Sequence, residues 1–165
     1  MADEIIERYG KRVGYSDSEL EKLNEEGHRI RHLKRVAKVA PLYSIEAEII
    51  RSRHCNSGHE KGQKFVMDVD GNFITKLCPK KMCVYLMSQL TVPVALINER
   101  LSEGHEPNDF HFMRYVRCPD KGVECMGYGE VMLKVQVVPR RLSENGFVAR
   151  SSGSFEGKAT RPKRP

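Results

Sequence analysis

The sequence predicts an α+β fold, in which a small, mostly antiparallel sheet of about five strands carries a covering helix and an N-terminal helical arm. Three observations predict it. Apolar side chains recur at helical spacing before residue 41, and from residue 43 they alternate with polar ones at the period of a half-buried strand. The dipeptide Asp70-Gly71 separates two short apolar runs, a pattern typical of a hairpin. At 165 residues the chain has the length of one domain.

The helical arm is expected over residues 1–41. Ser16 and Glu19 have the spacing of a capping box, so Ser16 is expected to cap a helix that continues to about residue 26. Gly27 fits the left-handed position that commonly ends such a helix.

A second, basic helix is expected over residues 28–40, with its end at Pro41. Two helices joined at a glycine could form a helix-turn-helix that binds DNA, or an arm that packs on the domain or on a partner. The second helix offers no Asn or Gln to read base edges, so the packing interpretation is favoured.

A cysteine-bearing α+β domain is expected over residues 42–139. One helix is predicted from Pro79, which suits a first turn, to about residue 92. Pro93 is expected to kink or end it, and any further turns should stop at Gly104. The predicted strands occupy residues 43–49, 64–69, 72–76, 111–117 and 131–137.

The net charge of +6 is concentrated in two short segments, residues 29–38 and residues 150–165. Outside them the chain has 18 basic and 21 acidic residues, so the globular part is slightly acidic. This distribution makes nucleic acid a less favoured partner than a protein with an acidic surface. Residues 140–165 contain almost nothing apolar and are expected to form a disordered basic tail.

Composition also excludes some classes of protein. No apolar run reaches the roughly 18 residues that a membrane helix needs. The charged N-terminus lacks the apolar core of a secretory signal, so a cytoplasmic protein is expected. Cysteines in that compartment stay reduced, which leaves inert thiols, a reactive thiol, or metal ligands.

The five cysteines differ in where they are expected to lie. Cys83 should lie inside the predicted helix, and the other four should lie at strand ends or in loops. Inert cysteines are usually buried inside elements, whereas loop thiols next to Pro or Gly suit a metal site or a nucleophile. The chain contains no Cys-x-x-Cys pair, so spacing by itself leaves all three alternatives open.

A zinc ion prefers four nitrogen or sulfur ligands in tetrahedral geometry. Three predicted loops supply that number: Cys55, His59, Cys78 and Cys118. An iron–sulfur cluster would prefer four thiolates, with Cys83 or Cys125 as the fourth. The roles of these two cysteines, and of His54, His105 and His111, stay open at this point.

Three motifs mark the middle of the chain: Cys-x-x-Gly-His-x-x-Gly at residues 55–62, Leu-Cys-Pro at residues 77–79, and Cys-Pro-Asp at residues 118–120. In these motifs residues 45–138 resemble a family of small uncharacterised cysteine-containing proteins of anaerobic bacteria and archaea. The resemblance implies a compact cysteine-bearing fold with no assigned activity. It also favours one set of residues over the remaining cysteines, namely Cys55, His59, Cys78 and Cys118.

The function expected from these observations is a metal-binding accessory subunit, holding zinc or an iron–sulfur cluster, of a larger metabolic enzyme. The chain lacks any other catalytic motif, and its basic segments suit docking on an acidic partner. One alternative is a thiol- or metal-dependent enzyme acting on a small organic substrate, with His59 or His105 near a reactive cysteine. Another is a nucleic-acid binder that uses residues 28–40 and the tail.

Overall fold

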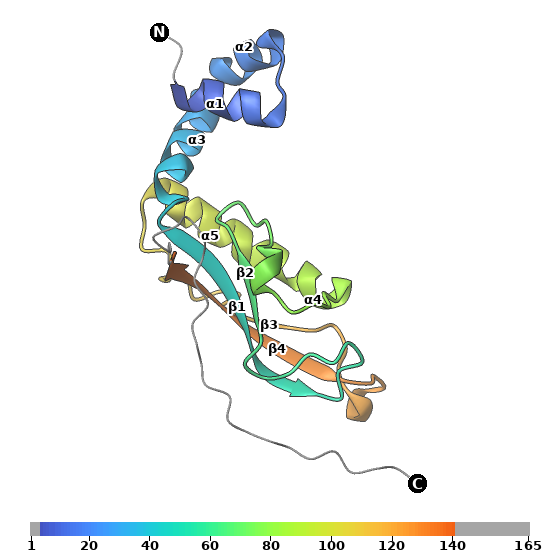
Figure 1. Ribbon diagram of the computed structural model, residues 1–165. Coiled ribbons are helices and arrows are strands. Elements are labelled where there is room, and N and C mark those ends of the chain that lie inside the picture. The colour runs from blue at the N-terminus through green and yellow to red at the C-terminus, as the bar shows by residue number, and fades with distance from the viewer. Residues whose placement is uncertain (1–3, 141–165) are drawn as a thin grey trace.

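The computed structural model describes residues 4–140, and it has an α+β fold with its N-terminal helices at one end (Figure 1). The chain runs through α1 (Glu4–Val13), α2 (Asp17–Glu25), α3 (Gly27–Val39), β1 (Tyr43–Arg53), β2 (Lys64–Met67), η1 (Thr75–Leu77), α4 (Val84–Met87), η2 (Ser88–Leu90), α5 (Thr91–Glu103), β3 (Tyr115–Arg117), η3 (Val123–Cys125) and β4 (Glu130–Pro139). None of the described helices is long and apolar enough to cross a bilayer.

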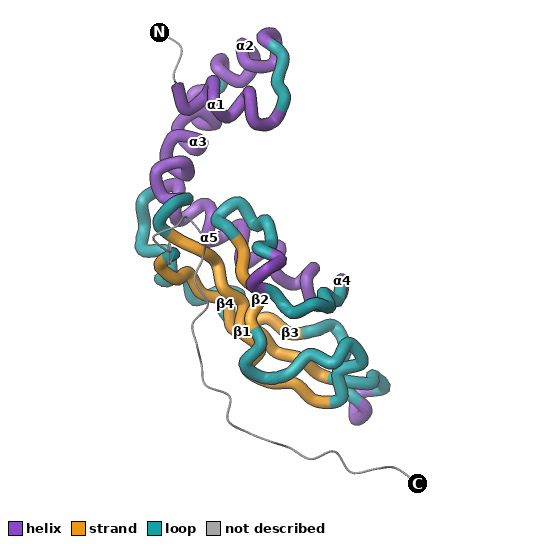
Figure 2. The backbone as a smooth tube through the Cα atoms, in the orientation of Figure 1, coloured by secondary structure: helices purple, strands orange, loops and turns teal. Residues whose placement is uncertain are grey.

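The described sheet is antiparallel throughout and has the strand order β2-β1-β4-β3 (Figure 2). The long strands β1 and β4 form its centre, where Ile45 pairs with Val137. An irregularity in β1 between Ile49 and Arg51 shifts the register by one residue before the strand ends. The sheet therefore has four strands in the described residues, rather than about five.

The missing strand is the one predicted at residues 72–76. The turn before it forms as expected, with Gly71 at φ +84°, but Asp70 keeps a negative φ. The Asp68 carboxylate accepts hydrogen bonds from the backbone N–H of Asp70 at 3.1 Å and of Asn72 at 2.8 Å. This side-chain turn leaves a single bridge between Met67 and Phe73, and the chain then enters η1.

The helix predicted from Pro79 begins later, at Val84, and the prediction for residues 79–83 is wrong. Cys78 Sγ accepts a hydrogen bond from the N–H of Val66 in β2 at 3.3 Å, which holds this part of the chain against the strand. Pro93 lies in the first turn of α5, where no N–H is needed, instead of breaking a helix. Gly104, at φ +74°, ends α5 as predicted.

The predicted strand at residues 111–117 is also shorter in the structure. Only Tyr115–Arg117 pair with β4, because the chain turns through Met113, whose φ is +62°. The predicted tail begins at Arg140, whose N–H donates to the carbonyl of Leu42 at 2.7 Å. The rest of that tail, residues 141–165, lies outside the described residues.

One hydrophobic core lies between the sheet and α5, the predicted covering helix (Figure 1). The alternation predicted for β1 and β4 is confirmed, because every second side chain enters this core. Its fully buried large members are Ile45, Ile49, Phe65, Met67, Val69, Leu86, Ile97, Leu133 and Val135.

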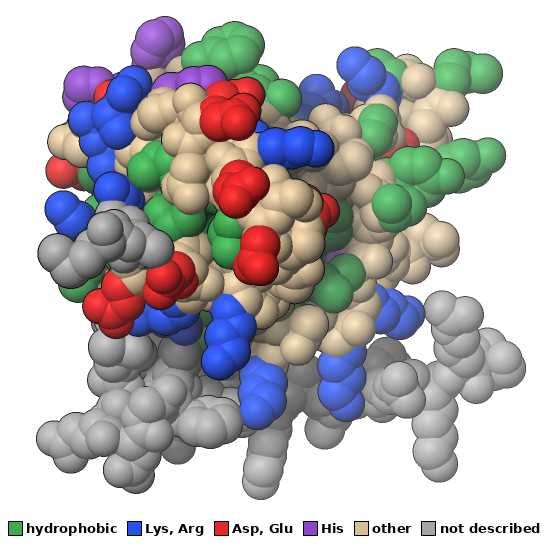
Figure 3. Space-filling view, turned by 90° about the horizontal axis from the view of Figure 1, so that it is seen from above, with side chains coloured by type: hydrophobic (Ala, Val, Ile, Leu, Met, Phe, Trp, Pro, Cys, Tyr) green, Lys and Arg blue, Asp and Glu red, His purple; other side chains and the backbone are tan. Residues whose placement is uncertain are grey.

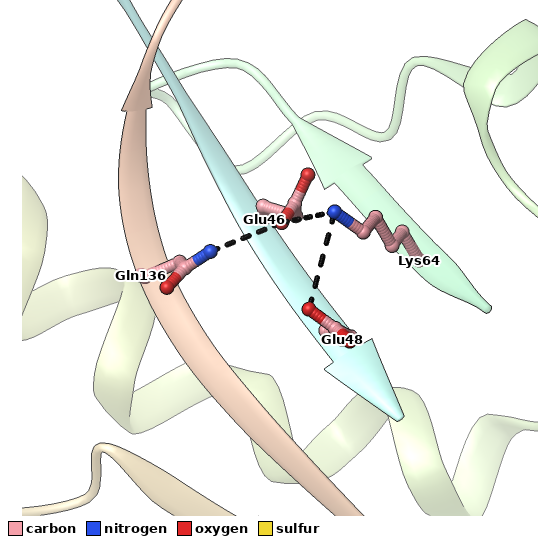
Figure 4. A network of polar contacts seen from close by, with 4 residues as sticks. All are labelled: Glu46, Glu48, Lys64 and Gln136. Carbon is pink, nitrogen blue, oxygen red and sulfur yellow. Dashed lines mark hydrogen bonds and ion pairs between the residues drawn. The ribbon is translucent and has the colours of Figure 1, made fainter. Parts of the chain in front are cut away.

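The opposite face of the sheet is polar (Figure 4). The Glu46 carboxylate accepts hydrogen bonds from Lys64 Nζ at 3.0 Å and from Gln136 Nε2 at 3.1 Å. Glu48 lies 3.9 Å from the same lysine nitrogen. The network joins β2, β1 and β4 across this face, so the strands share side-chain contacts as well as backbone hydrogen bonds.

The capping box of α2 is confirmed, since the backbone N–H and the hydroxyl of Ser16 both donate to Glu19 Oε2, at 2.7 and 2.8 Å. The prediction that Gly27 ends α2 is wrong, because Gly27 is the first residue of α3. The extended residue between the two helices is Glu26, at φ −104° and ψ 90°.

Helix α3 contacts the α+β domain through apolar packing and through an ion pair. Val36 is buried in the common core, and Arg35 Nη1 lies 2.7 Å from Glu103 Oε2 at the end of α5. Seen from the arm, acidic and basic side chains are intermixed over this end of the molecule (Figure 3). This mixture lacks the single-sign surface that is typical of nucleic-acid binders.

Candidate functional site: a cavity lined by three cysteines

Three cysteines line one open cavity of about 820 Å³: Cys55, Cys83 and Cys118. The topology explains why two of them meet. Strands β1 and β3 both run antiparallel to β4, so both end at the edge of the sheet where β4 begins. Cys55 follows β1 and Cys118 follows β3, so the two thiols reach the same edge from segments far apart in the sequence.

The third thiol comes from the segment that precedes α4. Cys83 is the N-cap residue of that helix, in extended conformation at φ −80° and ψ 121°. The sequence analysis placed Cys83 inside a helix, but the helix begins one residue later, at Val84. Cys83 therefore lies in a loop, like the other cysteines of the cavity. The neighbouring Tyr85 lines the same cavity.

The segment from Cys118 to Glu130 is folded around the Asp120 carboxylate. The N–H of Cys118 donates to the carbonyl of Val131 at 2.9 Å, which closes the base of the loop. Asp120 then accepts hydrogen bonds from the N–H groups of Gly122, Tyr128 and Gly129, at 3.1, 2.8 and 2.9 Å. These donors hold the pKa of the Asp120 carboxyl below its usual value, so Asp120 is ionised at neutral pH.

Two glycines let this loop pack closely. A Cβ on Gly127 would overlap Asp120 Oδ1, and a Cβ on Gly129 would overlap the carbonyl oxygen of His54. His54 itself adopts a left-handed conformation, with φ of +50°, and lines the cavity. Backbone strain of this kind is common beside functional sites, because the surrounding structure must hold it in place.

The environment of Cys83 favours its thiolate. Burial raises the pKa of this thiol, but hydrogen bonds from the Leu86 N–H, the Ser57 hydroxyl and the Tyr85 N–H outweigh burial and lower it. Ser57 lines the cavity from the loop that carries Cys55, so the two loops are linked at the sulfur. A thiolate in a cavity open to solvent is a nucleophile and a ligand for soft metals.

Cys118 has the opposite environment. Its thiol pKa is raised, first by burial and then by the negative charges of Cys83, Asp120 and Cys55, although the N–H of Asp120 opposes the change. The cavity therefore contains one thiol with a lowered pKa, Cys83, and one with a raised pKa, Cys118.

The remaining two residues of the predicted metal set lie elsewhere. Cys78 packs against β2 and the core, and burial raises its thiol pKa despite the hydrogen bond from Val66. His59 is 4% exposed and packs edge-on against Phe65, with ring centroids 5.4 Å apart. Neither lines the cavity, so the structure brings together two of the four predicted residues, Cys55 and Cys118, and adds Cys83.

His59 is nevertheless unusual. Burial lowers the pKa of its imidazole, against a hydrogen bond that the ring donates to Gln63 and that raises it, and Lys81 lowers it further. Its Nε2 atom is buried and has no hydrogen-bond partner among the described residues. The Ser52 hydroxyl donates to the His59 carbonyl oxygen at 2.6 Å, which fixes the backbone at this point.

In the described residues, the cysteine, histidine and acidic side chains are not arranged as a metal site. Within residues 4–140, no group of three or more of them is spaced to hold a metal ion. Among the donors around the cavity, the three sulfurs are soft ligands that suit zinc or copper(I), and binding would require side chains to move closer together.

Exposed apolar side chains lie on two segments that border the cavity. Tyr85 and Tyr128 line it from these two segments, and Tyr128 is 82% exposed. Met126, at the turn of the second segment, is 97% exposed and has a φ of +64°. The other members are Met82, Val84 and Val123. Such side chains are available to a ligand or to another protein.

Sequence reasoning missed Cys83 and the two tyrosines, because it placed Cys83 inside a helix and considered only the metal-ligating residue types. No contact of His105, His111 or Cys125 with the cavity is described. No family model, curated protein or solved structure matches this chain. The resemblance in the cysteine motifs therefore stays a prediction, and the proposal below depends on the geometry of the cavity.

Proposed function

We propose that this protein is a thiol-dependent enzyme that acts on a small organic substrate, with Cys83 as its nucleophile. The observation that carries the proposal is the convergence of Cys55, Cys83 and Cys118 on one open cavity. A volume of about 820 Å³ is in the range of cavities that enclose small organic ligands.

Ionisation of Cys83 is the first requirement of the mechanism. The hydrogen bonds from Leu86, Ser57 and Tyr85 supply it, because each donor stabilises the negative charge on sulfur.

The chemistry that fits these groups is addition to a polarised double bond. The Cys83 thiolate would form a sulfur–carbon bond while the π bond of a C=O or C=C group breaks, and the electron pair would take up a proton. Cys118 supports this step, because its raised pKa keeps a proton on sulfur beside the thiolate. His54 also lines the cavity.

Alkylation by iodoacetamide tests the proposal. In this reaction the thiolate forms a sulfur–carbon bond and iodide leaves, so the rate follows the thiolate fraction. Mass spectrometry of the native full-length protein at neutral pH should find Cys83 labelled about tenfold faster than the exposed Cys125. Cys78, with its raised pKa, should be the slowest of the three.

Two variants make the result specific. Ser57→Ala removes one donor to Cys83 and should slow its labelling. Ser88→Ala removes a surface hydroxyl that donates to the Tyr85 carbonyl and accepts from Gln89 Nε2, and it should leave the rate unchanged. Labelling of Cys83 no faster than that of Cys125 would contradict the proposal.

A second candidate is a metal-binding accessory subunit, supported by the electrostatic coupling of three thiols. Thiolates at Cys83 and Cys55 would both repel a charge on Cys118, and a divalent cation bound among the three sulfurs would relieve that repulsion. In this alternative the basic helix α3 would dock on an acidic partner.

Zinc titration against a chromophoric competitor separates the two candidates. A metal site predicts one zinc per chain, with binding lost in both Cys83→Ser and Cys118→Ser and retained in Cys78→Ser. If these three variants bind zinc as the parent does, the metal-binding candidate is wrong.

A further inference from the structure

We propose that the cysteine cavity selects uncharged or cationic substrates and excludes anionic ones such as phosphates and carboxylates. This inference rests on the proposed function and specifies its substrate class. Three kinds of group could bind an anion near the cavity: backbone N–H donors, arginines and lysines. The N–H donors of the Cys118–Glu130 loop and the arginines Arg51 and Arg117 already contact carboxylates of the chain itself.

The backbone donors are the first case. The loop from Cys118 to Glu130 has the form of an anion-binding nest, with several N–H groups pointing toward one position. Asp120 occupies that position, and its two oxygens accept the N–H groups of Gly122, Tyr128 and Gly129. A phosphate would find these donors taken and would face a fixed negative charge.

The arginines are the second case. Glu130 lines the cavity, and its Oε1 lies 3.2 Å from Arg51 Nε and 3.7 Å from Arg117 Nη2. The Glu130 side chain is 12% exposed, whereas the Arg51 and Arg117 side chains are 47% and 46% exposed. Both guanidinium groups are thereby directed to a residue of the chain and away from a ligand.

The described lining contains no lysine or arginine, and His54 is its one residue that could carry a positive charge. The remaining wall is largely apolar or aromatic, with Tyr85, Pro119, Tyr128 and Val131. Tyrosine rings bind flat uncharged groups and cations, which interact favourably with the negative ring face. An ionised Cys83 adds a further negative charge that an anionic substrate would have to approach.

Three methanethiosulfonate reagents of similar size test this selectivity. They carry a neutral hydroxyethyl, an anionic sulfonatoethyl or a cationic trimethylammonioethyl group. In each case the thiolate forms a disulfide bond with the reagent, and methanesulfinate leaves. Rates at Cys83 and Cys125 are measured in the same full-length protein, so Cys125 corrects for the intrinsic reactivity of each reagent.

The neutral-to-anionic rate ratio should be about tenfold larger at Cys83 than at Cys125, which is the effect of one like charge in a partly screened site. The cationic reagent should react at Cys83 at least as well as the neutral one, relative to Cys125. Glu130→Gln should reduce this discrimination, because it frees Arg51 and Arg117 to attract the anionic reagent. Glu48→Gln, on the polar face of the sheet, is the matched control and should have no effect.

The outcomes distinguish this inference from the proposed function. If Cys83 reacts rapidly with the neutral reagent but shows no preference against the anionic one, the selectivity is wrong and the nucleophile stands. If Cys83 reacts with the neutral reagent no faster than Cys125, the proposed function fails and the inference fails with it.

Discussion

At the scale of single residues, hydrogen bonds to sulfur and carboxylate define the candidate site. Asp120 illustrates how far the sequence could predict it. The Cys-Pro-Asp motif identified Cys118 correctly as a residue at the end of a strand. The role of Asp120 as acceptor depends on the folded loop, because two of its donors, Tyr128 and Gly129, lie 8 and 9 residues further along the chain.

The packing of this loop around Asp120 predicts a strong effect of Gly127→Ala. The new Cβ would overlap the Asp120 carboxylate and crowd the backbone nitrogen of Gly122, 2.9 Å away. Such overpacking should lower the free energy of unfolding by about 1–3 kcal/mol. Gly27→Ala is the control, because its Cβ would lie 3.7 Å from the Arg31 side chain and should leave stability unchanged or slightly raised. Equal denaturation midpoints for the two variants would contradict this description of the loop.

Buried His59 predicts a specific dependence of stability on pH. Burial lowers its pKa in the folded state, so the unfolded chain binds a proton more readily. The stability associated with neutral His59 is complete above the unfolded pKa of about 6.5 and declines as pH falls below it. His59→Gln should remove this decline, so the difference in unfolding free energy between parent and variant should shrink from pH 7.5 to pH 5.5. A constant difference across that interval would show that His59 is not buried as a neutral group.

At the scale of elements, the periodicity of apolar residues and the residue types at turns and caps predicted most of the helices and strands. The alternation of β1 and β4, the capping box of α2 and the end of α5 at Gly104 are confirmed. The errors lie where a hydrogen bond to a side chain competes with the local propensity for a strand or a helix. The hydrogen bond from Val66 to Cys78 and the Asp68 turn are such cases, and they removed a predicted strand and the start of a predicted helix.

The covering helix α5 should contribute much more to stability through its buried face than through its ion pair. Ile97 is fully buried against the sheet, so Ile97→Ala should cost about 2–5 kcal/mol of unfolding free energy. Arg35 and Glu103 are both about half exposed, and Arg35→Ala should cost less than about 1 kcal/mol. Chemical denaturation of both variants checks this order, and a larger loss in Arg35→Ala would contradict it.

At the scale of the whole molecule, antiparallel topology is what assembles the cavity. Because β1 and β3 flank β4 and end at the same edge, Cys55 and Cys118 meet although 63 positions separate them in the sequence. The sequence predicted both residues as loop cysteines, but it could not predict strand order, and therefore not which thiols would share a cavity. Cys83 joins them only because α4 begins after it.

The proposed mechanism depends on a lowered pKa of the Cys83 thiol, and the ultraviolet absorbance of the thiolate measures that pKa directly. A pH titration of the full-length protein, minus the same titration of Cys83→Ser, isolates the ionisation of this residue. The expected midpoint lies below the ordinary cysteine value of about 9.0, because three hydrogen-bond donors lower the pKa of Cys83. A midpoint at or above that value would show that burial outweighs the three hydrogen bonds, and Cys83 would then not be the nucleophile.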